Sequence, residues 1–480
     1  MVVIENNRLI DALAAVVGTD NVQPAPLARK NYASDQWWYA IAAAHQNTPI
    51  SVPDAAVTPS TPEQVAQIVK IANAHRVPIT PWGGGSGVQG AANADHGGIV
   101  VDMRRMKAIR SIDHKSLTCV VEAGLSCRDF EAALNAQGLS FTHYPASAEW
   151  ATIGGSINAR GSGVLSTKYG KIEDHVLSIE FVTPMGELVH TPSVPRHAAG
   201  PEITQLFMGA EGVFGIVTAA VVKLRRLPQK RVFAAFAFEN LSAGIEAGRR
   251  IMVSGLRPAV MRLYDQHAAS HSLARAVERT LQHHTMVLMF DGEFPALVEL
   301  EAEIAFGIAR ECGGQELSAG LGETWWDRRY VFYYPPYAPE LPSVWGTVDV
   351  VADYEHIEAT YHEVTTAIRA AVEPQWNLSL NTHFSHWYEW GSMIYARMKI
   401  PTGPEDLREA KALHDRIFTA GVEAALRAGA VINDHHGVGL RLEPFMFDQY
   451  GAAGMNVLNA IKRGLDPNHI LCPGKLGLQP

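Results

Sequence analysis

Apolar and polar residues follow one another at two spacings along the chain, one typical of helices and one typical of strands. A helix is predicted after Ser60, because Thr61 can cap its first turn and Pro62 can take the first helical position. The apolar face of this helix consists of Val65, Ile68, Val69 and Ala72. Further helices are predicted over 8–17 and 126–137, and strands over 77–82, 98–102, 117–121 and 176–183.

The pattern changes near Leu227-Pro228. Beyond this point strands are predicted over 231–238, 259–264, 285–290 and 347–351. They alternate with helices that begin near Ser242, Pro295 and Ile357. The helix after Pro295 has four apolar residues on one side, Leu297, Leu300, Ile304 and Ile308. The spacing is too irregular for a repeat protein, and the layout predicts an antiparallel sheet backed by helices.

A glycine-rich loop, Pro81–Gly90, joins two of the predicted strands. Its five glycines let the backbone lie close to a ligand and point N–H groups at a phosphate. Residues 85–90 also fit the pattern G-x-G-x-x-G, but only residues 91–97 separate them from the next strand. A Rossmann fingerprint requires a helix there, and such a crossover needs roughly ten residues or more. The loop therefore predicts a phosphate site built from loop amides, and the alternative is a plain surface loop.

Two further glycine-rich tracts lie at 143–163 and 208–218. The first is predicted to be a second loop that faces a ligand, because serine, threonine and asparagine alternate there with glycine. Their hydroxyl and amide groups can hydrogen-bond the polar edge of a cofactor ring or a ribityl chain. Three such tracts on short strands suggest one extended, nucleotide-like ligand bound along a single domain.

Composition limits the class of protein. A chain of 480 residues is long enough for two or more domains, and its 47% hydrophobic and 19% charged residues are ordinary for a soluble protein. The net charge of −9 argues against a general binder of nucleic acid or anionic membranes. No transmembrane segment or signal peptide is predicted. Four scattered cysteines, Cys119, Cys127, Cys312 and Cys472, predict free thiols in a cytoplasmic protein; peripheral membrane attachment stays open.

Taken in order, the tracts resemble the vanillyl-alcohol oxidase and p-cresol methylhydroxylase family of flavoproteins. The landmarks of the resemblance are Pro81–Gly90, Pro145–Gly163, Tyr169–Asp174, Glu211–Thr218 and Asp466–Lys475. It implies an α+β fold with a two-subdomain FAD-binding domain of p-cresol methylhydroxylase type over 1–228, completed by residues from about 445 to 480. Residues 229–444 would form a substrate or cap domain whose antiparallel sheet is flanked by helices.

The resemblance implies FAD as the cofactor, held by the three glycine-rich tracts. The first group of implied contacts is Trp82, Gly83, Gly84, Gly85, Ser86 and Gly87. The second group is Pro145, Ser147, Thr152, Gly154, Gly155, Asn158, Ser162 and Gly163. The third group is Glu211, Gly215, Ile216 and Val217. No histidine lies at 82–90, where some relatives attach the flavin covalently, so noncovalent FAD is expected.

Two branches of this family compete. One contains FAD-linked 2-hydroxy-acid dehydrogenases, and the other contains alkyldihydroxyacetone-phosphate synthase, which uses FAD without net redox. Stretches around Arg196, Arg262, Tyr395 and His435-His436 look more like the synthase, which has a further histidine where this chain has Asp434. Carried over, Arg262 would bind an anionic substrate group and Tyr395 would donate or accept a proton beside the two histidines. Arg196 is a weaker catalytic candidate.

Chemistry supports these residue types. Oxidising an alcohol or 2-hydroxy acid at a flavin requires a base for the hydroxyl proton and a cation for the carboxylate or phosphate. On a strand His435 and His436 would face opposite sides, so only one of them is expected to enter the site. Arg262 lies on a predicted strand and needs an anion, which is either the substrate or Asp265.

Other features narrow the expected partners. Dehydrogenases of the family often carry a metal site, H-x-G-D-G-N-x-H plus Glu-His-Gly, but here the matching region is degraded, so no metal is expected. His383 and His386 are three residues apart, which is wrong for one face of a strand and favours unrelated polar positions. The aromatic stretch Trp325–Tyr337 lines either a substrate pocket or a core or dimer contact. We expect a small-molecule substrate, an electron acceptor that the sequence does not identify, and a homodimer.

Overall fold

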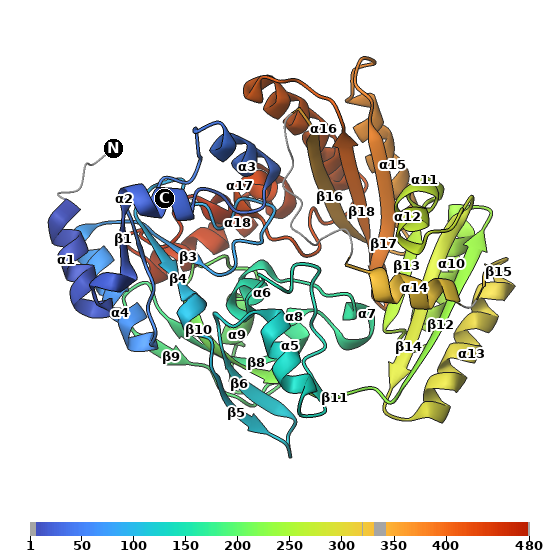
Figure 1. Cartoon of the computed structure of the whole chain (residues 1–480), viewed down its shortest axis with the longest axis horizontal. Helices are drawn as coiled ribbons and strands as arrows, with labels where there is room; N and C mark the ends of the chain where they lie inside the picture. The colour runs from blue at the N-terminus through green and yellow to red at the C-terminus, as the bar shows by residue number, and fades with distance from the viewer. Residues whose placement is uncertain (1–5, 319, 331–341, 479–480) are drawn as a thin grey trace. The chain divides into compact units, whose positions relative to one another are not determined.

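The computed structural model describes residues 6–318, 320–330 and 342–478, which form two compact units (Figure 1). The first unit contains the chain up to Gly161, Lys171–Arg225 and the chain from His435 onward. The second unit contains Ser162–Gly170 and Arg226–Asp434.

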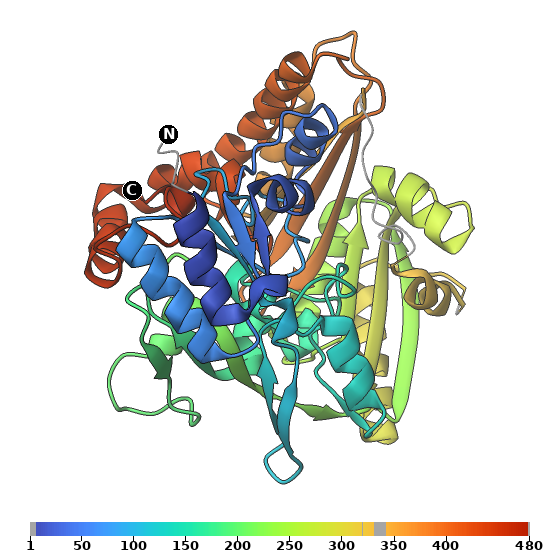
Figure 2. The same ribbon diagram turned by 60° about the vertical axis from the view of Figure 1, so that its left-hand side comes forward.

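A four-stranded sheet at the start of the first unit carries the first glycine-rich loop (Figures 1 and 2). Its order is β1-β2-β4-β3, with β1 Val22–Pro24, β2 Ala55–Val57, β4 Ile99–Asp102 and β3 Ile79–Trp82. Strands β3 and β4 are parallel neighbours with no helix between them, as the spacing predicted. Helices α1 (Asn6–Val17) and α4 (Pro62–His75) bury their apolar faces on this sheet. Thr61 caps α4 by accepting the N–H of Gln64 at 3.3 Å.

A five-stranded antiparallel sheet completes the first unit. Its order is β5-β6-β10-β8-β9, with β5 Ile109–Asp113, β6 Thr118–Glu122, β10 Ile216–Lys223, β8 Val176–Val182 and β9 Leu188–His190. One face of this sheet packs on α5 (Cys127–Asn135) and α6 (Ile153–Ala159), around Val121, Phe130 and Ile157. The first and third glycine-rich tracts adjoin strands β3 and β10 of these sheets.

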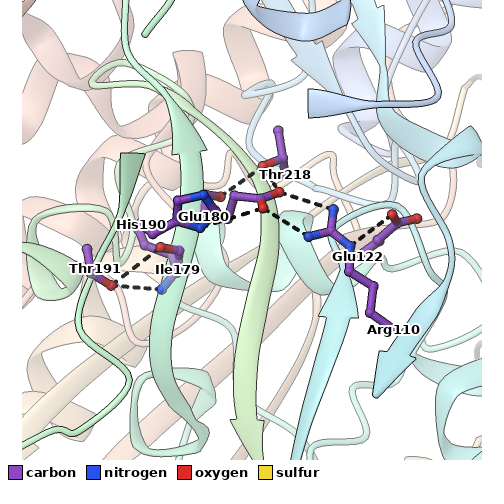
Figure 3. A network of polar contacts seen from close by, with 7 residues as sticks. All are labelled: Arg110, Glu122, Ile179, Glu180, His190, Thr191 and Thr218. Carbon is purple, nitrogen blue, oxygen red and sulfur yellow. Dashed lines mark hydrogen bonds and ion pairs between the residues drawn. The ribbon is translucent and has the colours of Figure 1, made fainter. Parts of the chain in front are cut away.

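A polar network crosses this second sheet from strand to strand (Figure 3). Arg110 on β5 bonds both carboxylate oxygens of Glu180 on β8, at 2.9 and 3.1 Å, and contacts Glu122 on β6 at 3.1 Å. Thr218 of β10 also donates to Glu180, at 2.7 Å. Burial acts to raise the pKa of Glu180, but the bonds from Arg110 and Thr218 outweigh it and lower the pKa. The network ties four strands together.

The second unit is built on a seven-stranded sheet. Its order is β15-β12-β14-β13-β17-β18-β16, and every pair with a defined register is antiparallel, as predicted. The strands are β12 Lys230–Phe238, β13 Val260–Tyr264, β14 His284–Gly292, β15 Gln315–Glu316, β16 Val344–Asp353, β17 Ser379–Trp387 and β18 Gly391–Ile400. One face is covered by α10 (Leu241–Val253), α13 (Pro295–Glu311), α15 (Ile357–Ala370) and α16 (Leu407–Arg427). On the other face α11 (Gln266–Ala268), α12 (Ala274–Val277) and α14 (Gly320–Arg328) cover β12, β14 and β13.

Helix α13 differs from the sequence expectation in the face that it buries. The predicted stripe turns to solvent, with Leu297, Leu300 and Ile304 exposed. Small residues and Phe306 face the sheet instead, and Phe306 packs on Phe236 and Phe290. Alanines allow a close approach of helix to sheet that the larger leucines would prevent.

The remaining helices are α2 Ala25–Asn31, α3 Trp38–His45, α7 Ser166–Tyr169, α8 Ile172–His175, α9 Ile203–Leu206, α17 Gly439–Leu442 and α18 Met446–Leu465. Two short strands, β7 Leu139–Ser140 and β11 Arg225–Arg226, form a separate pair. None of the helices in the described ranges has the length and hydrophobicity that a bilayer crossing requires. The four cysteines are free, as predicted.

Candidate cofactor and catalytic sites

The first glycine-rich loop is pressed against the second tract. A Cβ on Gly84 would lie 1.7 Å from the carbonyl oxygen of Trp150, and one on Gly83 would lie 2.4 Å from Oγ1 of Thr152. Neither position can therefore hold a side chain. In the described part of the chain the backbone N–H groups from Gly84 to Gly87 have no protein acceptor. Such free, closely spaced N–H groups suit the oxygens of a phosphate.

The second tract is not a continuous loop, because its centre forms helix α6. Thr152 caps this helix by accepting the N–H of Gly155 at 3.1 Å. Gly154 lies inside the helix, where a Cβ would come within 2.8 Å of Ala123. The prediction of a loop was wrong here, since Gly154 lets the helix approach Ala123 closely. At the end of the tract Ser162 and Gly163 belong to the second unit.

The third tract fastens the C-terminal segment to the second tract. The backbone N–H groups of Glu211 and Gly212 donate to Asn158, at 3.1 and 2.9 Å. The Glu211 carboxylate accepts the N–H of Val438 at 2.6 Å and that of Gly439 at 3.0 Å. Burial raises the pKa of Glu211 to about 7, although both N–H donors oppose the rise. Gly215 directly precedes Ile216 and Val217, the first residues of β10. A Cβ added to Gly215 would lie 2.8 Å from the carbonyl oxygen of Val182.

The C-terminal tail, residues 466–478, is hydrogen-bonded to the end of the first glycine-rich loop. The ammonium of Lys475 is buried and donates to the carbonyls of Gly90 at 3.3 Å and Asn93 at 3.1 Å, and to Asp95 at 2.8 Å. Leu471 extends the four-stranded sheet by a parallel bridge to Ile79. The tail is therefore part of the first unit, and its lysine brings a positive charge to the loop that offers free N–H groups.

Sequence reasoning missed a segment that also supports this loop. Gln36 donates its N–H to the carbonyl of Gly87 at 2.8 Å, and Trp37 packs on Gly90. Asp35 is fully buried, and burial raises its pKa to about 6 against bonds from Trp37 and Asn93. No local pattern at 35–37 indicates this role, because the partners lie about fifty residues away along the chain.

In the second unit a row of polar side chains crosses one face of the sheet. Register pairs Tyr264 with His383, His383 with Tyr395, and Tyr395 with Asp349. The rings of His383 and Tyr395 stack with centroids 4.8 Å apart. Directly paired residues share a face, so Tyr395 lies on the face opposite the four large helices.

Arg262 belongs to the same face, two residues before Tyr264 on β13. Its guanidinium lies 5.5 Å from the centre of the Trp325 ring, and the Trp325 indole donates to the Tyr264 hydroxyl at 2.8 Å. The Asp265 carboxylate, the alternative partner, accepts the N–H of Ala268 at 2.7 Å and the hydroxyl of Tyr361 at 3.1 Å. Within the aromatic stretch Trp325 is therefore a core residue, whereas 331–337 lie outside the described residues.

His386 and Asp434 form a buried pair that sequence reasoning missed. Nδ1 of His386 lies 2.9 Å from the Asp434 carboxylate, which also accepts the hydroxyl of Tyr388 at 2.6 Å and that of Ser162 at 3.4 Å. The spacing of three residues between His383 and His386 is wrong for one face of a regular strand. This reasoning fails because the pairing of β17 with β18 shifts between Phe384 and Trp387. His386 is therefore not an unrelated polar residue.

The two adjacent histidines are not on a strand. Residues 434–436 form a bend, and the rings of His435 and His436 lie side by side with centroids 4.1 Å apart and an angle of 46° between their planes. The prediction that they point to opposite sides was therefore wrong. Arg196 is exposed on the loop after β9, with a φ of 59°. The expectations of no metal and of a direct FAD contact for each named residue stay predictions.

The residues of the first unit fit a dinucleotide with a pyrophosphate. The donors that such a group requires come from the free N–H groups of the first glycine-rich loop and from the buried lysine that contacts this loop. The second and third tracts, which are hydrogen-bonded to each other, lie beside them in the same unit. Residues 53–192 match the family model described as an FAD binding domain. Residues 227–476, just over half of the chain, match the model described as the C-terminal domain of FAD linked oxidases.

Relatives with assigned names fall into both branches. The chain is 27% identical over 502 residues to alkyldihydroxyacetonephosphate synthase of Trypanosoma brucei brucei, covering 97% of this chain and 80% of that protein. It is 28% identical over 433 residues to glycolate oxidase subunit GlcD of Bacillus subtilis (strain 168), covering 89% of each. Crystalline p-cresol methylhydroxylase with bound substrate shares the fold, with a TM-score of 0.78 and 19% identity over 100% of this chain and 98% of that one.

Proposed function

We propose that this chain, which belongs to the FAD-linked oxidases and binds FAD, oxidises an alcohol or a 2-hydroxy acid. The observation that carries the proposal is the polar row on one face of the seven-stranded sheet. It combines a cation, Arg262, with the phenol of Tyr395 and an imidazole, His383, on neighbouring strands. These are the groups that anchor an anionic substrate and handle its hydroxyl proton.

Each group has a distinct part in this proposal. Bound FAD supplies a two-electron acceptor for the hydrogen on the substrate's carbinol carbon. Arg262 binds the carboxylate or phosphate of the substrate, and Tyr395 hydrogen-bonds its hydroxyl group. A histidine takes the hydroxyl proton; the sequence offers His435 and His436, and the structure adds His383 and His386. Arg196, which is exposed, has at most a part in attracting the anion.

We assign the FAD contacts to the residues that the three tracts supply. The N–H groups from Gly84 to Gly87 hold the pyrophosphate, with Trp82 and Gly83 at the entry of the loop. The second and third tracts contribute the remaining contacts, Pro145, Ser147, Thr152, Gly154, Gly155, Asn158, Ser162, Gly163, Glu211, Gly215, Ile216 and Val217. We also propose noncovalent FAD, a homodimer and a cytoplasmic location. Acid precipitation that leaves the yellow colour in the supernatant supports noncovalent FAD, and light scattering tests the homodimer.

An anaerobic bleaching screen tests the oxidation. Purified holoenzyme is mixed without oxygen with a panel of alcohols and 2-hydroxy acids, and flavin absorbance is followed. At least one compound is expected to bleach the flavin, and Arg262→Met should raise its half-saturating concentration by about 10–100-fold, because an ionic hydrogen bond contributes about 1.5–3 kcal/mol. Lys399→Met, on the same sheet but not in the polar row, is the control. A panel without any bleaching refutes the proposal.

A transferase is the second candidate, favoured by the 27% identity to a synthase over 97% of the chain. It would exchange the acyl group of a dihydroxyacetone-phosphate ester for a long-chain alcohol, and no electron acceptor would be consumed. Incubating the holoenzyme with such an ester and an isotope-labelled alcohol tests it. Labelled ether product formed without oxygen or added acceptor supports this candidate, and its absence eliminates it.

A further inference from the structure

We infer that His386, held in place by Asp434, is the histidine that takes the substrate's hydroxyl proton. This inference rests on the proposed oxidation and names the base that it requires. It replaces the adjacent pair His435-His436, to which the sequence pointed, by a residue that the sequence gave reason to dismiss. All of the contacts that support it lie within the second unit.

A bulge in β17 sets the direction of His386. From Phe384 to Trp387 strand β17 advances three positions, while the opposite strand advances only two, from Ile394 to Ser392. The extra residue breaks the alternation of the strand at this point. The backbone around the bulge is held on both sides, since Ser392 donates its hydroxyl to the carbonyl of His386 at 3.0 Å and Trp387 donates its N–H to Thr167 at 3.2 Å. Bulges of this kind often redirect a side chain next to an active site.

Asp434 fixes the proton on one nitrogen of the ring. Its carboxylate receives hydrogen bonds from Tyr388 at 2.6 Å and Ser162 at 3.4 Å, and it lies 2.9 Å from Nδ1 of His386. An ionised carboxylate only accepts hydrogen bonds, so its close contact with the ring places the hydrogen on Nδ1. Nε2 then presents its lone pair, which is the form that a general base needs.

Both members of the pair are buried. A buried carboxylate beside an imidazole stabilises the imidazolium that forms when the ring takes a proton. Among the described residues, Asp434 contacts His386 directly, Tyr388 donates to the same carboxylate, and His435 follows Asp434 in the chain.

The competing histidines are arranged differently. The rings of His435 and His436 are 4.1 Å apart, so a proton on one places its charge beside the other. His383 lies between two phenol rings, 5.5 Å from that of Tyr264 and 4.8 Å from that of Tyr395. In the proposed step the substrate O–H bond breaks, its proton passes to Nε2 of His386 and a C=O bond forms. The two electrons and the carbon-bound hydrogen leave to FAD.

The ring form of His386 can be measured without any substrate. In holoenzyme labelled with ¹⁵N-histidine, the signals of His386 are identified by their loss in His386→Asn, and spectra are taken at pH 8.5. We expect hydrogen on Nδ1 and a bare Nε2, and in Asp434→Asn a shift of the population toward hydrogen on Nε2. A wild-type ring with its hydrogen on Nε2 overturns the inference.

Kinetics then test the role of the ring in the reaction. With a substrate from the bleaching screen, His386→Asn and Asp434→Asn should each slow flavin reduction by about 10²–10⁴-fold, the range for a general base. The rise of the wild-type rate with pH should disappear in His386→Asn, while FAD affinity stays within about twofold of wild type.

A second histidine–aspartate pair, in which a buried histidine meets a partly exposed aspartate, provides the control. On α16, His414 is buried and its Nδ1 lies 3.0 Å from Asp415. Asp415→Asn removes the same chemical group and should leave the rate and its pH dependence unchanged. If His386→Asn keeps the wild-type pH dependence, and His435→Asn or His436→Asn loses it, the inference is overturned while the oxidation stands. If no compound bleaches the wild-type flavin, the oxidation fails, and the ring form alone decides whether Asp434 orients His386.

Discussion

Glu211→Gln gives the sharpest test of how the C-terminal segment is held. The carboxylate accepts the N–H groups of Val438 and Gly439 in the folded protein, where it is buried. Burial holds its pKa at about 7, against 4.5 in water, so the charged form is disfavoured inside the protein. Local opening of the segment exposes the carboxylate and returns its pKa to the lower value.

The two pKa values fix the direction in which the stability of the closed segment changes with pH. Below pH 4.5 the carboxyl group is protonated whether the segment is closed or open, and the closed state has its full stability. Between pH 4.5 and 7 the open state releases the proton while the closed state keeps it, so opening becomes easier. The full effect is about 3 kcal/mol, or a few hundred-fold in the opening constant, and is reached above pH 7.

Hydrogen exchange of a peptide that spans residues 435–441 measures this opening. After correction for the intrinsic exchange rate, protection in the wild-type holoenzyme should fall by about two orders of magnitude from pH 5 to pH 8. In Glu211→Gln it should be nearly independent of pH, because glutamine does not titrate. At pH 8 the variant avoids the cost of burying a charge but lacks the ionic hydrogen bonds, which are worth about 1.5–3 kcal/mol, so its protection reflects one gain and one loss.

Glu131→Gln is the matched control. Glu131 is a partly buried glutamate of the first unit; burial raises its pKa, and it accepts the N–H of Phe141 at 2.8 Å. Its substitution should leave the exchange of residues 435–441 as in wild type. Parallel pH profiles for wild type and Glu211→Gln would show that another group controls the segment and would refute the reasoning.

Three further predictions concern the first unit. Gly84→Ala should abolish FAD retention, because a Cβ there would lie 1.7 Å from a carbonyl oxygen; Gly307→Ala, with nothing within 4 Å, should retain FAD, and the flavin absorbance ratio of the purified proteins decides. Lys475→Met removes a buried cation from the loop and should raise the FAD dissociation constant by about 10–100-fold in equilibrium dialysis, as expected for a lost ionic hydrogen bond; an unchanged constant would dismiss this role. Thr61→Ala should lower unfolding stability by about 1 kcal/mol through loss of the helix cap, and an unshifted melting curve would contradict that assignment.

Much of the fold follows from local sequence. The helix after Thr61 forms where its cap, proline and apolar spacing agree, and Val65, Ile68, Val69 and Ala72 are all buried. The short span between Pro81–Gly90 and the next strand excluded a crossover helix, and β3 and β4 are indeed parallel neighbours joined by a loop. The antiparallel sheet of the second unit and the FAD-binding class are confirmed as well.

Tertiary contacts decided other features. The prediction of a loop at Gly154-Gly155 failed because glycine permits close packing as well as ligand approach, and only the position of Ala123 shows which applies. The stripe on α13 was apolar but exposed, since the sheet accepts the alanine face of the helix more closely. Periodicity identifies an apolar face but does not identify the surface on which it packs.

The candidate site depends even more on the folded chain. Sequence by itself determined the types of residue involved: glycine tracts for a phosphate, an arginine for an anion, and a tyrosine and histidines for a proton. Tertiary structure decided their partners, because His386 meets Asp434 across 48 positions and Glu211 meets Val438 across 227. One extra residue in β17 cancelled the alternation by which the sequence separated His386 from its neighbours. A bulge and a buried carboxylate arise only when distant segments pack, and for that physical reason the local pattern did not reveal them.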